Sequence, residues 1–210
     1  VSSGVDGADL YQLNVFDGSD LNRDIASGKV PPAATTSMQG DMFEFGRTYL
    51  EARAYRRLSA AHWSANNRER SLYNILAKAG VPMFPFGSGA GGNVDGYGMM
   101  LHRALKPYED MVSRGEKPFM ALMKQSDLQP FVNQVVSQLE QGYLDINTLV
   151  AMDSRLDELN WLYKLWEKRG LVSYNGLLYK LTSAGEFWTV NITQSTLEAM
   201  EYILTGKNSF

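Results

Sequence analysis

The sequence predicts an α/β fold: a partial (β/α) barrel segment followed by a mainly helical, winged-helix-like C-terminal domain. Residues 10–16 and 58–63 are short apolar runs typical of strands. Between them, residues 36–57 place apolar side chains three or four positions apart, which indicates an amphipathic helix. A third apolar run, 81–86, leads into a glycine cluster. Three strands cannot close a barrel, so we expect a piece of one with parallel strands.

The elements of the first half are bounded by turn residues. Asp17 and Gly18 end the first strand, and a loop rich in Gly and Pro precedes the long helix. A shorter helix is expected at 71–79. Glycine at high density permits positive φ angles or the close approach of a ligand to the backbone. Such a cluster follows the third strand: Gly87, Gly89, Gly91, Gly92, Gly96 and Gly98.

The second half is predicted to be helical with one hairpin. Residues 116–126 are expected to form a connector, and helices are expected at 128–140, 144–152 and 156–168. Asn175 and Gly176 form the preferred two-residue turn, which predicts a hairpin over 171–180. Thr182 is a candidate N-cap for a last helix. We therefore expect two domains, 1–105 and 106–210.

Composition excludes several classes of protein. The 210 residues include 20 basic and 23 acidic side chains, a net charge of -3, which lacks the basic footprint of a nucleic-acid-binding protein. No apolar run approaches the roughly 18–20 residues that cross a bilayer, so no membrane partner is expected. The chain has no cysteine, which excludes disulfides and thiolate-held metals and favours a cytoplasmic protein. No metal ligands are predicted.

Three motifs resemble one family in order and spacing. The segment 9–18, DLYQLNVFDG, resembles a barrel strand and its following loop in oxygen-independent coproporphyrinogen III oxidase-like proteins. The segment 86–91 resembles their GxGxGA strand end, and 181–194 resembles their C-terminal LTxxGxxW…NIT segment. Gly87–Gly98 followed by MMLH is similar to the HutW/ChuW branch of haem-utilisation radical-SAM proteins.

The resemblance implies a reaction for the full protein. A [4Fe-4S] cluster would cleave S-adenosylmethionine, a methyl group would be transferred to haem, and the macrocycle would open and release iron. The family's cysteine motif is absent, so we expect a C-terminal part that is inactive alone. An electron donor and haem-handling proteins are possible partners. The alternatives are a coproporphyrinogen-oxidase-like or haem-trafficking radical-SAM protein, or a non-catalytic haem-binding or docking module.

The resemblance also implies which residues contact the cofactor. Strand ends of barrel folds collect ligand-binding groups. The residues expected near S-adenosylmethionine are Gln12, Phe16, Asp17, Gly18, Gly87, Gly89 and Gly91. The alternative is that Asp17 and Gly18 form an ordinary turn and that the glycines form a flexible loop.

A second set of residues is predicted to act on the substrate. His62 is the catalytic candidate, because histidine can move protons or bind haem iron, and the adjacent Trp63 offers a flat surface to a macrocycle. Arg68 and Arg70 could pair with haem propionates, and Tyr97 could line the pocket. The alternative for His62 and Trp63 is a structural strand end. His102 is expected to have a packing role.

Two expectations concern surfaces. The winged-helix order suggests DNA binding only by analogy of fold, and the acidic residues of 156–168 oppose it, so a lid or docking module is favoured. The strand edge at 9–16 would lack its neighbours in an incomplete barrel. Unpaired edges associate, so this chain is expected to self-associate through that segment.

Overall fold

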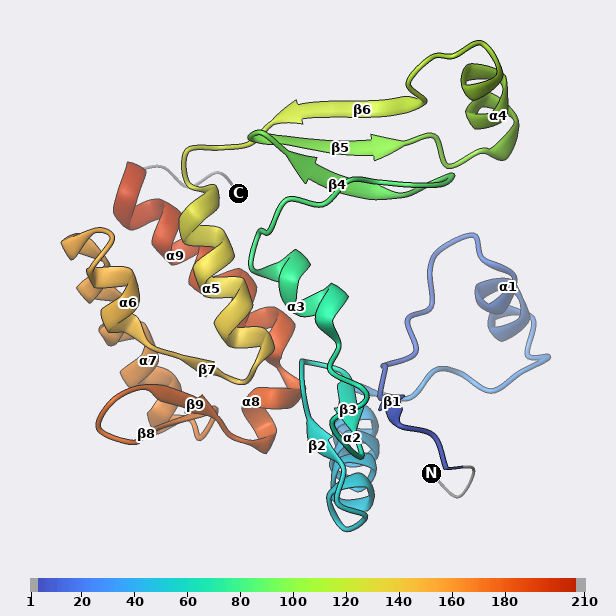
Figure 1. Cartoon of the computed structure of the whole chain (residues 1–210). Helices are drawn as coiled ribbons and strands as arrows, with labels where there is room; N and C mark the ends of the chain where they lie inside the picture. The colour runs from blue at the N-terminus through green and yellow to red at the C-terminus, as the bar shows by residue number, and fades with distance from the viewer. Residues whose placement is uncertain (1–3, 207–210) are drawn as a thin grey trace. The chain divides into compact units, whose positions relative to one another are not determined.

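The structure is a computed structural model that describes residues 4–206 (Figure 1). It has two compact units. Unit 1 comprises the chain up to Ser71 together with Leu139–Leu144 and Asn160–Ile192. Unit 2 comprises Leu72–Gln138, Asp145–Leu159 and the chain from Thr193. Each unit takes segments from both halves of the chain. The domains expected at 1–105 and 106–210 stay a prediction.

The first sheet of unit 1 is small and antiparallel. It contains β1 (Gly7–Asp9), β2 (Arg56–Arg57) and β3 (His62–Ser64) in the order β1-β3-β2. Asp9 lies directly opposite His62, and Arg57 lies opposite Trp63. Side chains alternate between the two faces of a strand. His62 therefore shares one face with Asp9, while Trp63 shares the other with Arg57.

Trp63 forms the centre of the core beneath this sheet. It is 1% exposed and packs in a cluster with Leu50 and Tyr55, against which Ala8 and Leu10 also lie. The Tyr55 hydroxyl donates to the carbonyl of Val5 at 2.7 Å. A short sheet with one buried face gains its stability from contacts of this kind.

Two helices precede β2. They are α1 (Asp20–Ala26), capped by Ser19, and α2 (Thr36–Glu51), capped by Thr35. The helix expected over 36–57 thus ends six residues early. Ala54 adopts a φ of 61°, and the Tyr55 N–H returns to the carbonyl of Leu50. This reversal ends the helix and directs Arg56 and Arg57 into a strand.

The expectation of parallel strands was wrong for the described chain. All the strand pairs given for residues 4–206 are antiparallel. The first strand is 7–9 rather than 10–16, and only the last residues of 58–63 enter β3. A parallel partner needs a crossover of a dozen or more residues. β2 and β3 are instead joined by a tight turn in which the Leu58 N–H donates to the carbonyl of His62. The mixed α/β content is confirmed.

Unit 2 contains a second antiparallel sheet. Its elements are α3 (Leu72–Lys78), β4 (Gly91–Val94), β5 (Tyr97–Leu101), α4 (Leu105–Ser113) and β6 (Phe119–Lys124), with the sheet order β4-β5-β6. The glycine cluster is therefore partly a hairpin, which turns at Asp95 and Gly96 with positive φ at both. The run 81–86 supplies only a bridge from Met83 to Asn93, and the expected connector 116–126 contains β6.

The helices expected in the second half are confirmed. The chain continues through α5 (Gln129–Glu140), β7 (Tyr143–Leu144), α6 (Ile146–Val150), a 3-10 helix (Ser154–Glu158), α7 (Leu159–Lys168), β8 (Val172–Tyr174), β9 (Tyr179–Leu181), α8 (Ser183–Phe187) and α9 (Thr189–Thr205). The third sheet has the order β7-β9-β8. Thr182 caps α8, and Trp188 separates α8 from α9. Across residues 4–206, no helix is long and apolar enough to cross a membrane.

Candidate functional site

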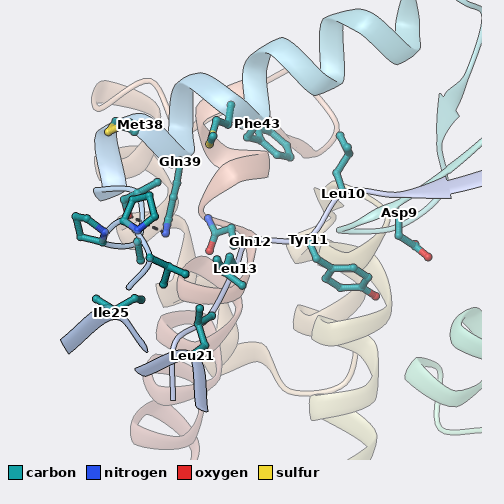
Figure 2. Close-up of a pocket in the computed structure, with 16 residues that line it drawn as sticks. Asp9, Leu10, Tyr11, Gln12, Leu13, Leu21, Ile25, Met38, Gln39 and Phe43 are labelled. Atoms are coloured by element: carbon teal, nitrogen blue, oxygen red, sulfur yellow. Dashed lines mark hydrogen bonds between the residues drawn. The ribbon is translucent and has the colours of Figure 1, made fainter. Parts of the chain in front are cut away.

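An open cavity of about 670 Å³ lies in unit 1 (Figure 2). Its walls come from residues 9–13, from α1, from the loop 30–34 and from the first turns of α2. The lining is mostly apolar, with Met38, Met42 and Phe43 on the α2 side, and it includes no lysine or arginine. Ligand pockets of this size are commonly apolar with a few polar groups. The polar side chains here include those of Asp9, Gln12 and Gln39.

The residues predicted around the first motif separate in the structure. Gln12 lines the cavity, whereas Phe16, Asp17 and Gly18 are not among its lining residues. Phe16 is 71% exposed, and Gly18 has a φ of 75° in a turn whose carbonyl accepts from Arg23. Asp17 and Gly18 therefore form an ordinary turn in this structure. Their contact with a cofactor stays a prediction.

His62 lies between two carboxylates on the polar face of the first sheet. Its Nδ1 is 2.7 Å from Oδ1 of Asp9, the residue directly opposite on β1. Its Nε2 is 3.3 Å from Oε1 of Glu69, a charge contact without hydrogen-bond geometry. The His62 side chain is 15% exposed. Both ring nitrogens are thus directed at acids rather than at open space.

The loop after β3 brings Glu69 back to His62. The Ser64 hydroxyl contacts the carbonyls of Asn66 and Glu69 and so curls residues 64–69. The Glu69 carboxylate accepts the backbone N–H of Ser71, whose φ of 50° is rare for a residue with a side chain. A Cβ on Gly7 would lie 2.9 Å from Cγ of Glu69 and 3.2 Å from the His62 ring. A glycine at this position lets the two side chains meet.

Arg68 and Arg70 follow the same strand but differ in their contacts. Arg68 pairs with Asp6 at 2.8 Å, and Asn66 also donates to that carboxylate. The Asn66 hydrogen bond, followed by the charge of Arg68, lowers the pKa of the Asp6 carboxyl. Arg70 is exposed at the surface. An arginine in an ion pair is less available to a propionate, so Arg70 is the better candidate of the two.

Trp63 lies on the opposite face from His62. A single ligand surface cannot be formed by adjacent residues of one strand, because their side chains point away from each other. The indole is also buried in the core of unit 1. The contacts of Trp63 therefore support a structural role for this residue.

The predicted glycines and Tyr97 belong to unit 2. Gly87 and Gly89 have φ angles of 92° and 75°, and the Gly89 N–H donates to the carbonyl of His102 at 2.8 Å. Gly91 begins β4, and Tyr97 begins β5 and is 43% exposed. His102 follows β5 and donates its backbone N–H to Pro118. These glycines fix a turn, and a ligand role for them stays a prediction.

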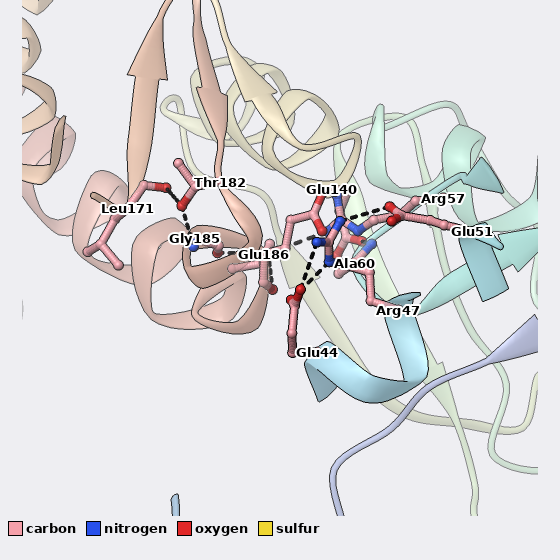
Figure 3. A network of polar contacts seen from close by, with 11 residues as sticks. Glu44, Arg47, Glu51, Arg57, Ala60, Glu140, Leu171, Thr182, Gly185 and Glu186 are labelled. Atoms are coloured by element: carbon pink, nitrogen blue, oxygen red, sulfur yellow. Dashed lines mark hydrogen bonds and ion pairs between the residues drawn. The ribbon is translucent and has the colours of Figure 1, made fainter. Parts of the chain in front are cut away.

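A network of charged side chains joins β2 to the C-terminal motif within unit 1 (Figure 3). Arg57 lies 3.6 Å from Glu186 and 3.4 Å from the Thr189 hydroxyl, and Glu140 accepts the N–H of Ala60 at 3.2 Å. Burial lowers the pKa of Arg57 and raises the pKa of Glu186, although Arg57 itself opposes the latter shift. Glu140 thus contacts the turn between β2 and β3, and Glu186 contacts β2 itself.

Sequence reasoning missed two residues of the site, Asp9 and Glu69. Asp9 was placed inside the family-like motif, but its neighbour across the sheet depends on the register of β1 with β3. Glu69 lies in a loop, and no periodic pattern places it near His62. The five-residue spacing from Ser64 to Glu69 does not indicate that the chain folds back toward His62. Only the three-dimensional contacts show that Glu69 lies beside it.

The fold resembles part of one solved structure. Coproporphyrinogen III oxidase (HemN) from Escherichia coli, described as a radical SAM enzyme, matches with a TM-score of 0.57 over 78% of this chain and 42% of that chain. The sequence identity is 14%, so this likeness concerns the fold alone. No family model matches the chain.

The chain is homologous to part of anaerobilin synthase. The protein of that name from Escherichia coli O157:H7 is 31% identical over 201 residues, which are 95% of this chain and 44% of the relative. This homology confirms the resemblance to the HutW/ChuW branch. The chain spans less than half the length of either protein that it matches.

An iron–sulfur cluster does not fit the residues of this chain. Clusters are held by cysteine thiolates, and the chain contains no cysteine. Within residues 4–206, no group of three or more histidine or acidic side chains is arranged to hold a metal ion.

Proposed function

We propose that this chain is a portion of a radical-SAM enzyme that degrades haem without oxygen, by methyl transfer, ring opening and release of iron. The observation that supports this most strongly is the homology to anaerobilin synthase over 95% of the chain. The cluster and its ligands would lie outside this chain, which alone would be inactive. S-adenosylmethionine and a [4Fe-4S] cluster would serve the full protein, with an electron donor and haem-handling proteins as partners.

The cavity of unit 1 is the proposed place for the haem macrocycle. Its apolar walls suit the ring, and the absence of cations in the lining would leave the propionates at the mouth. His62 is proposed to serve proton transfer at this cavity, and Arg70 is a proposed contact of the substrate. Tyr97, in unit 2, stays a candidate substrate contact of the full protein. S-adenosylmethionine is proposed to contact the motif 12–18 of unit 1. Gly87, Gly89 and Gly91 of unit 2 stay candidate cofactor contacts of the full protein. The barrel-segment and winged-helix descriptions of the two halves stay part of this proposal.

The test is an anaerobic reaction of the full-length protein that contains this chain. The protein, with its cluster reconstituted, is given haem, S-adenosylmethionine and a reductant. We expect loss of the Soret band, release of iron and a product heavier than the opened macrocycle by one methyl group. Conversion of coproporphyrinogen without consumption of haem would favour the runner-up, a coproporphyrinogen-oxidase-like enzyme, which the HemN-like fold supports. Haem binding without turnover would favour a docking or trafficking module.

Self-association is a further part of the proposal. The segment 10–16 exposes Tyr11, Leu13 and Phe16 by 79%, 61% and 71%. At its start the Leu10 N–H donates to the carbonyl of Ala61 at 2.9 Å. An apolar extended segment without a neighbouring strand is a surface on which chains associate.

A further inference from the structure

His62 occupies a position from which it can pass a proton but cannot bind iron. Its Nε2 has almost no exposed surface and faces Glu69, and its Nδ1 contacts Asp9. An iron ligand needs a nitrogen lone pair directed at the metal. An imidazole between two carboxyl groups can instead accept a proton at one nitrogen and release one at the other. Of the two roles that the sequence left open, the geometry favours proton transfer.

The two acids lie at different places on the surface. The Asp9 side chain is 46% exposed and stands at the rim of the cavity, beyond Leu10 and Tyr11 in Figure 2. The Glu69 side chain is 36% exposed on the far side of the imidazole. Asp9 therefore lies where a ligand in the cavity could reach it, and both acids are partly open to solvent.

The row that these three side chains form is held in place by contacts of the loop after β3 and by the lack of a side chain at Gly7. Ser64 and Ser71 fix the loop and the carboxylate of Glu69, and Gly7 leaves the space in which Glu69 and His62 meet. Ser71 has a strained backbone at this point. Strain of this kind costs free energy and is kept where the surroundings require one geometry.

We propose that Glu69, His62 and Asp9 form a proton relay that delivers protons to a macrocycle bound at the cavity as its iron leaves. This inference rests on the proposed function. Two of the four nitrogens that hold iron in haem are anionic. When an iron–nitrogen bond breaks there, the nitrogen keeps the electron pair and takes a proton from Asp9, which becomes a carboxylate.

The relay then restores Asp9 without any redox change. His62 gives the proton on Nδ1 to Asp9 and takes one at Nε2 from Glu69, which recovers a proton from hydronium or a buffer acid in the solvent. The oxidation state of iron is the same before and after this step. Asp9 is the residue that would touch the substrate. His62 and Glu69 would act through it, and are positioning and proton-supplying residues.

The experiment measures iron release separately from haem binding. In the full-length protein, haem affinity is measured by titration of the Soret band, and release is followed in a single turnover with an iron chelator. Asp9→Asn should slow release by about 100-fold, the contribution typical of a general acid, and should change haem affinity far less than the rate. His62→Gln and Glu69→Gln should slow it by about tenfold, as is typical of residues that orient another group. Asp20→Asn, a matched change at an exposed acid outside the cavity lining, should change neither quantity.

Chemical rescue separates proton transfer from a structural role. Formate should restore part of the rate to Asp9→Ala, and imidazole should do so for His62→Gly, since each supplies the missing proton carrier. If Asp9→Asn releases iron at the unaltered rate, or if neither compound restores any rate, the relay is overturned while the proposed function stands. If the unaltered protein binds no haem, the proposed function fails and the relay with it.

Discussion

Two segments of unit 1 that both resemble family motifs have opposite relations to the rest of the chain. The C-terminal motif packs against other residues of the chain: Thr182 caps α8, Gly185 lies against Leu171, and Glu186 pairs with Arg57. The segment 10–16 has an apolar alternation of the same quality but is largely exposed. A pattern in the sequence thus specifies which side chains can be buried, and whether they are buried depends on a partner.

The difference also separates folding from function. The polar groups of the C-terminal motif form contacts with other residues of this chain. Residues 9–13 instead line the cavity, and Asp9 among them contacts His62. We therefore expect substitutions in the core and the C-terminal motif to act on stability, and substitutions in the first segment to act on binding.

The largest effect is expected at Trp63. Trp63→Ala should lower the free energy of unfolding by about 4 kcal/mol, because removal of a buried indole leaves a cavity between Leu50 and Tyr55. Urea denaturation followed by circular dichroism measures this loss. A change below about 1 kcal/mol, combined with a loss of haem binding, would show that Trp63 serves the substrate after all.

Gly185→Ala should be the next most damaging change. Its Cβ would lie 2.0 Å from the carbonyl oxygen of Leu171, and backbone cannot move aside as a side chain can. We expect a loss of about 3 kcal/mol, at the upper end for overpacking. Gly40→Ala is the matched control: its Cβ would find nothing closer than 4.0 Å, and alanine favours the helix. Equal losses at both positions would contradict the close approach.

A smaller effect on folding is expected in the exposed segment. Phe16→Ser should change the free energy of unfolding by less than about 0.5 kcal/mol, as is usual for exposed positions. It should nevertheless weaken self-association, measured by sedimentation velocity at high micromolar concentration. A strict monomer for the unaltered chain would remove the basis of the association proposal.

The smallest effect concerns pH. Hydrogen bonds from the side chain and backbone of Arg155 lower the pKa of Asp153 to about 2, from an ordinary value of 3.8. The folded chain therefore binds this proton less tightly than the unfolded chain. The resulting stabilisation is present above pH 3.8 and is lost as the pH falls through 2. Asp153→Asn keeps a capping oxygen but should flatten acid denaturation slightly in that window. An unchanged slope would contradict the ion pair.

Features that depend on interactions between residues close in the sequence could be predicted, and features that depend on distant residues could not. The helix 128–140, the cap at Thr182 and the family resemblance depend on local patterns, and they were confirmed. The strand assignments at 10–16 and 81–86 failed because a strand exists only with a neighbour. His62 was selected from its type and position, whereas Asp9 and Glu69 required the register of β1 with β3 and the curl of a loop.

The alternation at His62 and Trp63 has an evolutionary consequence. The two adjacent residues are under different structural constraints, because His62 faces the polar row and Trp63 faces the core. In related proteins, position 63 should vary only among bulky apolar residues. Position 62 should vary only among residues that can exchange a proton, and changes there should be accompanied by changes at positions 9 and 69. Substitutions at 62 and 63 should therefore be inherited independently of each other.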